Sequence, residues 1–272
     1  MKADVKSGLE GIVVAESSIC AIDGQEGTLS YRGIDIGDLA EHSTYEETVF
    51  LLWYGRLPSQ DELNEFKMRL AKERPVDETI WQILVALPDS PPPMEALRTA
   101  VSALSSCDPD GDDYGHEANL KKAIRLTTRL PIIVAYYYRH LSDLQRIDPD
   151  FSLGHAANFL YMLRGERAVP IEERAMDLAM VLMADHEFNA STFAARVTAS
   201  TLSDLYSAIT TAIGTLKGPL HGGANQRAMK MLLEIDTVDR VEPYIREALA
   251  AKKRIMGFGH RVYRQCADPR SA

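Results

Sequence analysis

From residue 36 onward, apolar residues recur every three to four positions, which is the spacing of helices with one buried face. Leu63, Phe66 and Leu70 form one such face, and Pro58 with the acidic residues that follow it is typical of a helix start. The same pattern predicts helical stretches over residues 44–53, 58–70, 75–87, 94–104, 119–139, 170–184, 191–216, 225–235 and 241–252. The chain is therefore predicted to be mainly α-helical.

Prolines mark the predicted interruptions of this helical pattern. Three consecutive prolines at residues 91–93 break the chain ahead of the stretch 94–104. Pro131 lies inside the stretch 119–139, where we expect a kink or a restart because proline cannot donate the intrahelical hydrogen bond. Residues 139–152 are predicted to form a connector.

The first 36 residues follow a different pattern. Short β-prone runs at residues 12–15, 18–22 and 28–31 are separated by the turn signals Asp23-Gly24 and Glu26-Gly27. This predicts a small β-hairpin or meander at the N-terminus. Strands and helices do not alternate after it, so a parallel sheet is not expected.

Composition and charge narrow the class of protein. Hydrophobic residues make up 46% and charged residues 25% of the 272 residues, which is typical of a globular enzyme. The net charge of −9 argues against non-specific binding of nucleic acid and against an anionic membrane surface. An anionic ligand would therefore need a local basic pocket.

Cysteine use and the terminal segment bear on the compartment. Cys20, Cys107 and Cys266 are odd in number and widely spaced, so they form neither a disulfide framework nor a C-x-x-C pair. The N-terminal segment has no apolar core of a signal peptide, and no apolar run approaches the ~20 residues of a membrane helix. We expect a cytoplasmic protein.

His221 lies in the glycine-rich segment 218–225, just ahead of a predicted helix. The partial positive charge of a helix N-terminus disfavours a protonated imidazole, and a neutral histidine can donate a hydrogen bond to a developing enolate oxygen. Glycines at positions 222 and 223 would let the backbone approach a ligand closely. The alternative is a loop histidine that bonds a backbone carbonyl, and the sequence alone does not choose between them.

His260 follows a basic helix end, Lys252-Lys253-Arg254, and the turn Gly257-Phe258-Gly259. Cations and free backbone amides here suit a phosphorylated cofactor, and the alternative is a solvated helix terminus. A dinucleotide fingerprint is not predicted, because Val262 stands where its third glycine belongs.

His186 stands in Asp185-His186-Glu187, which matches the start of the zinc motif H-E-x-x-H. Ala190 occupies the second histidine position, so the paired ligand is absent and no metal site is predicted. A satisfied, partly buried histidine is the alternative to a ligand-binding role.

Five segments, at residues 27–33, 97–102, 184–192, 218–225 and 257–270, together resemble the citrate synthase family over essentially the whole chain. The resemblance implies an almost wholly α-helical two-domain homodimer. We place the large helical domain, with the N-terminal β-hairpin, at residues 1–217 and the beginning of the small domain at residues 218–272. The implied activity is the condensation of acetyl-CoA with oxaloacetate and water to give citrate and CoA, the entry step of the tricarboxylic acid cycle.

The resemblance also implies roles for individual residues. His221 resembles the histidine that stabilises the thioester enol, and His260 the one that polarises the ketone. His186 and Arg270 resemble the binders of oxaloacetate. The CoA site would be lined by Arg254, Ile255, Met256, Gly257 and Phe258. Coenzyme A thioester is a co-substrate in this chemistry, and no permanently bound cofactor is expected.

The same resemblance places the catalytic aspartate beyond the position that matches Ala272, so we expect the sequence to lack its C-terminal part and proton abstraction to fail. Asp268, in the Asp-Pro-Arg motif, has a different role in the family pattern. Met183 stands where the family often has histidine, and the segment between His260 and Asp268 is one residue longer than expected.

Two alternatives to citrate synthesis stay open. The same residues would serve 2-methylcitrate synthesis from propionyl-CoA, because one methylene changes selectivity by only ~1 to 3 kcal/mol. A chain without the catalytic aspartate could instead be a non-catalytic relative that acts as a binding or interaction protein.

Overall fold

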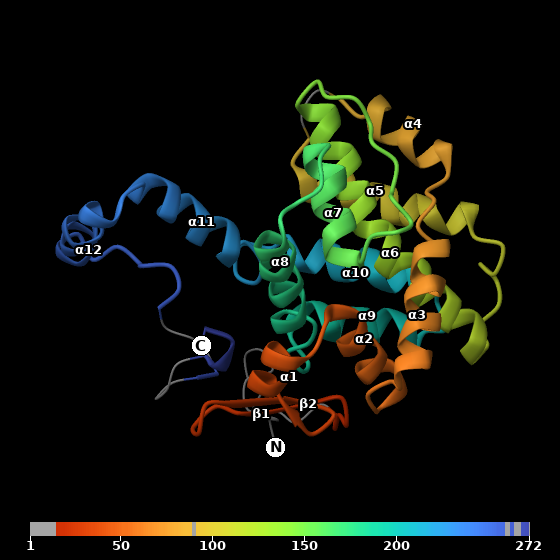
Figure 1. The fold of residues 1–272 in the computed structure, drawn as a ribbon, viewed down its shortest axis with the longest axis horizontal. Helices are drawn as coiled ribbons and strands as arrows, with labels where there is room; N and C mark the ends of the chain where they lie inside the picture. The colour runs from red at the N-terminus through yellow and green to blue at the C-terminus, as the bar shows by residue number, and fades with distance from the viewer. Residues whose placement is uncertain (1–14, 89–90, 259–261, 264–267, 272) are drawn as a thin grey trace, which may run out of the picture.

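The structure is a computed structural model that describes residues 15–88, 91–258, 262–263 and 268–271. Helices dominate the described chain, and a small sheet lies at its N-terminal end (Figure 1). The prediction of a mainly α-helical fold with a small N-terminal β region is confirmed. The first predicted β-prone run, residues 12–15, lies almost wholly outside the described residues.

The sheet is a three-stranded antiparallel meander of β1 (Cys20–Asp23), β2 (Thr28–Tyr31) and β3 (Ile34–Asp35). Cys20 pairs with Tyr31 and Asp23 with Thr28, so the turn signals predicted from the sequence join β1 to β2. Tyr31 pairs in turn with Ile34. Side chains of β2 alternate between exposed and buried, and the buried ones face the helices.

The helices, in chain order, are α1 (Ile36–His42), α2 (Tyr45–Tyr54), α3 (Gln60–Lys72), α4 (Glu78–Ala86), α5 (Pro93–Leu104), α6 (His116–Leu141), α7 (His155–Arg164), α8 (Pro170–Leu182), α9 (Ala190–Ser200), α10 (Leu205–Leu216), α11 (Ala224–Ile235) and α12 (Val241–Ala250). Short 3-10 turns cover Ser105–Cys107, Val238–Arg240 and Pro269–Ser271. Thr44 and Ser59 begin α2 and α3 with reciprocal capping boxes to Glu47 and Glu62.

Three details differ from the sequence prediction. Of the kink or restart predicted at Pro131, the restart is wrong, because α6 runs through the proline without ending; proline removes only one hydrogen bond of this 26-residue helix. α7 was not predicted, because its buried face includes His155 and Asn158, which do not read as apolar. The predicted stretch 191–216 is two helices, α9 and α10, separated by residues 201–204.

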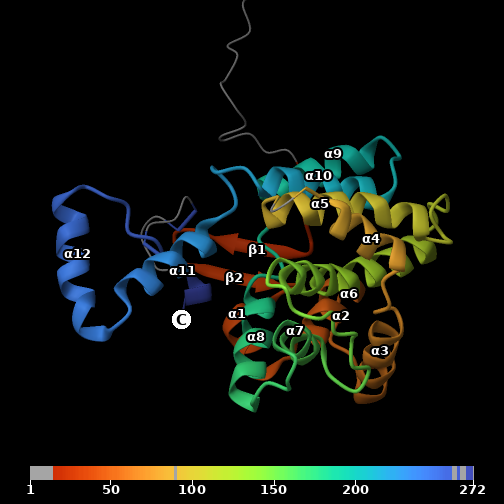
Figure 2. The same cartoon turned by 90° about the horizontal axis from the view of Figure 1, so that it is seen from above.

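Helices α9, α10, α5, α6, α7 and α8 succeed one another across the molecule, each packed on the next (Figure 2). The main core lies between α4, α5, α6 and α10, and includes Ile80, Val101, Ile133 and Tyr206. α9 and α10 are rich in small residues, so their backbones pack closely, as the sequence predicts. This layered body leaves the end of α8 beside the N-terminal sheet.

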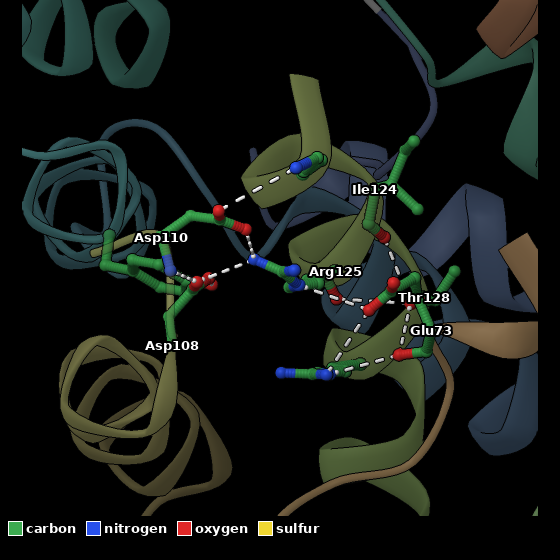
Figure 3. A network of polar contacts seen from close by, with 9 residues as sticks. Glu73, Asp108, Asp110, Ile124, Arg125 and Thr128 are labelled. Carbon is green, nitrogen blue, oxygen red and sulfur yellow. Dashed lines mark hydrogen bonds and ion pairs between the residues drawn. The ribbon is translucent and has the colours of Figure 1, made fainter. Parts of the chain in front are cut away.

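A buried ion network fastens the loop after α5 to α6 (Figure 3). Arg125 of α6 contacts Asp108 and Asp110 at 2.6 Å each and Glu73 at 3.1 Å. Asp108 is fully buried at its side chain and also accepts the hydroxyl of Tyr206 from α10. The loop after α5, α6, α10 and the end of α3 are thus joined at one point.

A second core joins the N-terminal sheet to α1, α2 and α8 through residues that include Leu29, Tyr31, Leu51 and Val181. α11 and α12 stand out from the helical body on one side (Figure 1). The chain then returns, and the turn Pro269–Ser271 lies against α1. The division into domains at residue 217 stays a prediction. None of the described helices is long and apolar enough to cross a membrane.

Candidate active site

His221 lies in the turn between α10 and α11, and its ring reaches the start of α9. Its Nε2 atom is 2.9 Å from the Ser191 hydroxyl oxygen and accepts the Ser191 backbone N–H at 3.2 Å. Asn189 caps the same helix end, because its side-chain oxygen accepts from the backbone N–H groups of Ser191 and Thr192. The ring is therefore held at the N-terminus of α9 as well as ahead of α11.

These contacts define the tautomer of His221. A backbone N–H can donate only to a ring nitrogen that carries no proton, so Nε2 is the acceptor and Nδ1 carries the hydrogen. Nδ1 is thus the ring nitrogen of His221 that can donate to a ligand. The sequence left open whether His221 merely bonds a carbonyl; its Nε2 atom instead accepts from an amide and contacts a hydroxyl.

Glycine is required at the two positions after His221 for different reasons. A Cβ atom on Gly222 would lie 1.9 Å from the carbonyl oxygen of Leu216, so only glycine fits against the end of α10. Gly223 has φ of +83°, the left-handed conformation that glycine adopts without strain. The sequence led us to expect that these glycines let the backbone approach a ligand. Gly222 instead lets the backbone approach the end of α10, and this contact fixes the turn that carries His221.

His186 lies in the loop between α8 and α9 and is half-buried. Its Nε2 atom is 3.2 Å from the hydroxyl oxygen of Tyr263, and the two rings meet edge to face with centroids 5.8 Å apart. Tyr263 is buried, and burial raises the pKa of its hydroxyl to about 12. The hydroxyl therefore keeps its proton at neutral pH.

Arg270 follows shortly after Tyr263 on the returning segment. Its Nε atom is 2.9 Å from Oδ1 of Asp268, and its Nη2 atom contacts the other carboxylate oxygen. The hydrogen bond to Asp268 is the main reason that the pKa of Arg270 is raised; burial opposes the shift and the charge of Asp268 adds to it. Arg270 thus lies in the same neighbourhood as His186, at the edge of the N-terminal sheet.

The remaining predicted site residues are His260 and the segment from Arg254 to Phe258. Arg254, Gly257 and Phe258 are exposed, whereas Ile255 and Met256 are half-buried. Their assignment to a CoA site stays a prediction, as do the roles of the other predicted site residues. His260 lies outside the described residues. Among the residues that the structure describes, no group of three potential ligands lies close enough to hold a metal ion.

Three residues of this neighbourhood were not selected from the sequence, namely Asn189, Ser191 and Tyr263. A helix cap such as Asn189 has a recognisable signature, since asparagine directly before a helix is a strong signal. Ser191 and Tyr263 gave no such signal, because their contacts to His221 and His186 span 30 and 77 residues.

Solved structures with this arrangement of helices are citrate synthases. The enzyme from Thermotoga maritima matches with a TM-score of 0.83 at 45% identity, covering 98% of this chain and 70% of that one. A ternary complex of the Thermoplasma acidophilum citrate synthase with carboxymethyl coenzyme A and oxaloacetate matches with a TM-score of 0.85 at 34% identity, covering 94% and 67%. The fold is that of the citrate synthase class of helical proteins.

The sequence comparisons agree with the fold. The family model described as the citrate synthase C-terminal domain matches residues 8–272. Citrate synthase 2 of Bacillus subtilis is 51% identical over 97% of this chain and 70% of its own, and citrate synthase of Haloferax volcanii is 48% identical over 100% and 73%. A 2-methylcitrate synthase of Mycobacterium tuberculosis is 46% identical over 97% and 66%. This chain belongs to the citrate synthase family.

Proposed function

We propose that this chain is a citrate synthase polypeptide, an acyltransferase that condenses acetyl-CoA with oxaloacetate and water to give citrate and CoA. The observation that carries the proposal is the orientation of the His221 ring, whose Nε2 accepts the Ser191 amide so that Nδ1 is the donor nitrogen. Such a donor stabilises an enolate oxygen without transferring a full proton to it. The proposal covers the entry step of the tricarboxylic acid cycle.

The reaction divides into steps that use these groups. A base removes a methyl proton from acetyl-CoA, and the Nδ1–H of His221 donates to the thioester oxygen that gains charge. The enol carbon then attacks the ketone of oxaloacetate, which His260 polarises. Water hydrolyses the citryl thioester and releases CoA. Each donor acts where charge develops, which is the main source of rate enhancement in such sites.

His186 and Arg270 are proposed to bind oxaloacetate. A guanidinium binds a carboxylate through two parallel hydrogen bonds, and Arg270 already holds the Asp268 carboxylate through Nε and Nη2. A substrate carboxylate would share this guanidinium with Asp268 or replace it. The segment from Arg254 to Phe258 is proposed to contact coenzyme A, because its three neighbouring cations suit phosphate groups.

The proposal extends to assembly and location. We propose that two copies form a homodimer in the cytoplasm, with oxaloacetate and acetyl-CoA as partners, and without a permanently bound cofactor, a metal ion or nucleic acid. Light scattering of the purified chain would test the dimer. A monomer at all accessible concentrations would contradict that part of the proposal.

The function is tested on the purified 272-residue chain after circular dichroism confirms that it is folded. Calorimetric titration with oxaloacetate measures binding, and release of the CoA thiol from acetyl-CoA measures the reaction. Oxaloacetate binding is the first readout, because the sequence predicts that the catalytic aspartate is missing. If the chain does release thiol, His221→Ala is expected to abolish that release, whereas His42→Ala alters an exposed histidine on α1 and serves as the matched control. A folded chain that neither binds oxaloacetate nor releases thiol would contradict the proposal.

A second candidate is 2-methylcitrate synthesis from propionyl-CoA. It is favoured by the relative from Mycobacterium tuberculosis, which bears that name at 46% identity. Thiol release from acetyl-CoA and from propionyl-CoA, compared at equal concentrations, separates the two. A clear preference for propionyl-CoA would replace the first proposal with the second.

A further inference from the structure

The N-terminal sheet touches the loop that carries His186 at several points. The hydroxyl of Tyr31 lies 3.0 Å from the carbonyl oxygen of Asp185 and accepts the Asp185 backbone N–H at 3.2 Å. It also lies 3.3 Å from the carbonyl oxygen of Val181. Val181 lies in the last turn of α8, where helical carbonyls lack partners within the helix, and Asp185 lies in the loop that follows. One hydroxyl thus sets the direction in which the chain leaves α8.

The ring of Tyr31 is held in one position by its packing in the core. Its side chain is fully buried in the core that joins the sheet to α1, α2 and α8. Burial raises the pKa of the hydroxyl to about 12, so it keeps the proton it donates. A buried hydroxyl that bonds a backbone carbonyl and an amide fixes both groups in one geometry.

Asp185 makes a second attachment to the sheet. Its carboxylate lies near the thiol of Cys20 on β1, and burial is the main reason that the pKa values of both groups are raised. Cys20 is 5% exposed, so this contact is shielded from water. The residue before His186 is therefore held to the sheet through both its backbone and its side chain.

The residue after His186 is also attached. Glu187 has φ of +55°, a left-handed conformation that is uncommon for a residue other than glycine, asparagine or aspartate. Its Oε1 atom accepts the backbone N–H of Ile22 on β1 at 3.1 Å, and its own N–H donates to Asp185 at 3.0 Å. Unfavourable backbone conformations persist where surrounding contacts hold them.

The segment that contacts the ring of His186 is fitted to the same sheet. A Cβ atom on Gly24, in the turn between β1 and β2, would lie 2.5 Å from the carbonyl oxygen of Val262. Val262 directly precedes Tyr263, whose hydroxyl lies 3.2 Å from the His186 ring. The sheet thus borders both the loop that carries His186 and the segment that contacts its ring.

We propose that the N-terminal sheet positions His186 for ligand binding and that the hydroxyl of Tyr31 is the positioning group. Tyr31 does not itself touch the ligand in this proposal; it acts through the backbone of Asp185. The ligand is a small oxo-dicarboxylate, and in that respect the inference rests on the proposed function.

The test compares Tyr31→Phe with Tyr137→Phe. Both changes remove one hydroxyl from a buried tyrosine and keep the ring. Tyr137 lies on α6, remote from the sheet, and its hydroxyl donates to the Pro91 carbonyl. The readouts are the thermal midpoint, the ring NMR signals of His186, assigned by their absence in His186→Asn, and the affinity for oxaloacetate.

Both variants are expected to lower the thermal midpoint, and Tyr31→Phe by more, since the Tyr31 hydroxyl bonds both the carbonyl and the amide of Asp185 whereas Tyr137 loses one hydrogen bond. Only Tyr31→Phe should shift the His186 signals and weaken oxaloacetate binding, by about fivefold to thirtyfold. Equal signals and equal affinity in the two variants would overturn the inference. If the unaltered chain does not bind oxaloacetate, the proposed function is overturned. The NMR signals of His186 would still test whether Tyr31 positions this ring, because that readout needs no ligand.

If Tyr31→Phe does not fold, Glu187→Ala tests the same attachment from an exposed side chain. It removes the acceptor of the Ile22 N–H and leaves α8 unchanged. A shift of the His186 signals supports the positioning role of the sheet, and unchanged signals contradict it.

Discussion

The hydroxyl oxygen of Ser191 lies 2.9 Å from Nε2 of His221, although 30 residues separate them in the chain. Ser191 is in the first turn of α9, and His221 immediately precedes the turn into α11. The imidazole is thus held at the N-terminus of α9. Its orientation depends on the cap of α9 and on the glycine turn that leads into α11.

Asn189→Ala is expected to lower the free energy of unfolding by about 1 kcal/mol, because it removes the N-cap of α9. Asn189→Asp keeps the acceptor oxygen and should stay much closer to the unaltered chain. Urea denaturation followed by circular dichroism measures both. Equal stability of the two variants would show that the cap contributes nothing.

Gly222→Ala is expected to destabilise the chain by about 3 kcal/mol, because the added Cβ meets the Leu216 backbone at 1.9 Å and the turn must shift. The shift should also move the NMR signals of His221. Gly214→Ala is the matched control. Its Cβ would come no nearer than 3.8 Å to the Arg98 side chain, and alanine inside α10 should stabilise the helix by up to about 1 kcal/mol. Similar losses in both variants would contradict the steric argument.

Arg125→Met should cost about 3 to 5 kcal/mol of unfolding free energy, because it leaves the buried carboxylate of Asp108 without a cation. Arg246→Met breaks an exposed pair with Glu242 one helical turn away, and should change stability by only about 0.5 kcal/mol. Denaturant unfolding of the two variants side by side checks the difference. Comparable effects would mean that the Arg125 network adds no stability.

Acid should weaken the fold through His155. Burial lowers the pKa of His155 from 6.5 to about 4 in the folded chain, where Glu46 opposes the shift and Arg74 adds to it. Between these values the unfolded chain binds a proton that the folded chain does not, so stability falls as the pH drops from 6.5 towards 4, by about 2 to 3 kcal/mol.

The stability of His155→Gln relative to the unaltered chain checks this, because glutamine has no proton to gain. The variant should be less stable than the unaltered chain at about pH 7, and the difference between their free energies of unfolding should narrow by about pH 4.5. His42→Gln alters an exposed histidine and should show no such change. A gap that stays constant with pH would refute the assignment to His155.

Much of the fold was predictable because its signals are local. Apolar spacing predicted most of the helices, and the turn signals after Asp23 predicted the hairpin. α7 was not predicted because its buried face carries His155 and Asn158. The side-chain oxygen of Asn158 accepts the Asp150 backbone N–H, and the backbone N–H of His155 donates to Glu46. Polar residues that are satisfied only in the folded chain do not show as apolar in a sequence.

The site was predictable only in part. The glycines around His221 identified the turn, but the reason for Gly222 is the Leu216 carbonyl, which no sequence pattern reveals. Tyr263 and Tyr31 act through contacts to residues far along the chain, to His186 and Asp185 respectively. Such contacts depend on the packing of α8 against the sheet and not on the residues beside them.

Tyr31 precedes Val181, near the end of α8, by 150 residues. This separation has a consequence for synthesis on the ribosome. β2 can be hydrogen bonded to β1 early, but the hydroxyl of Tyr31 has no partner until residues 181–185 have emerged. At about 5 to 20 residues per second, the nascent chain waits roughly ten seconds or more with this side of the sheet uncovered. Completion of α8 is thus the event that closes the N-terminal core, and a chaperone that shields Tyr31 would act during this interval.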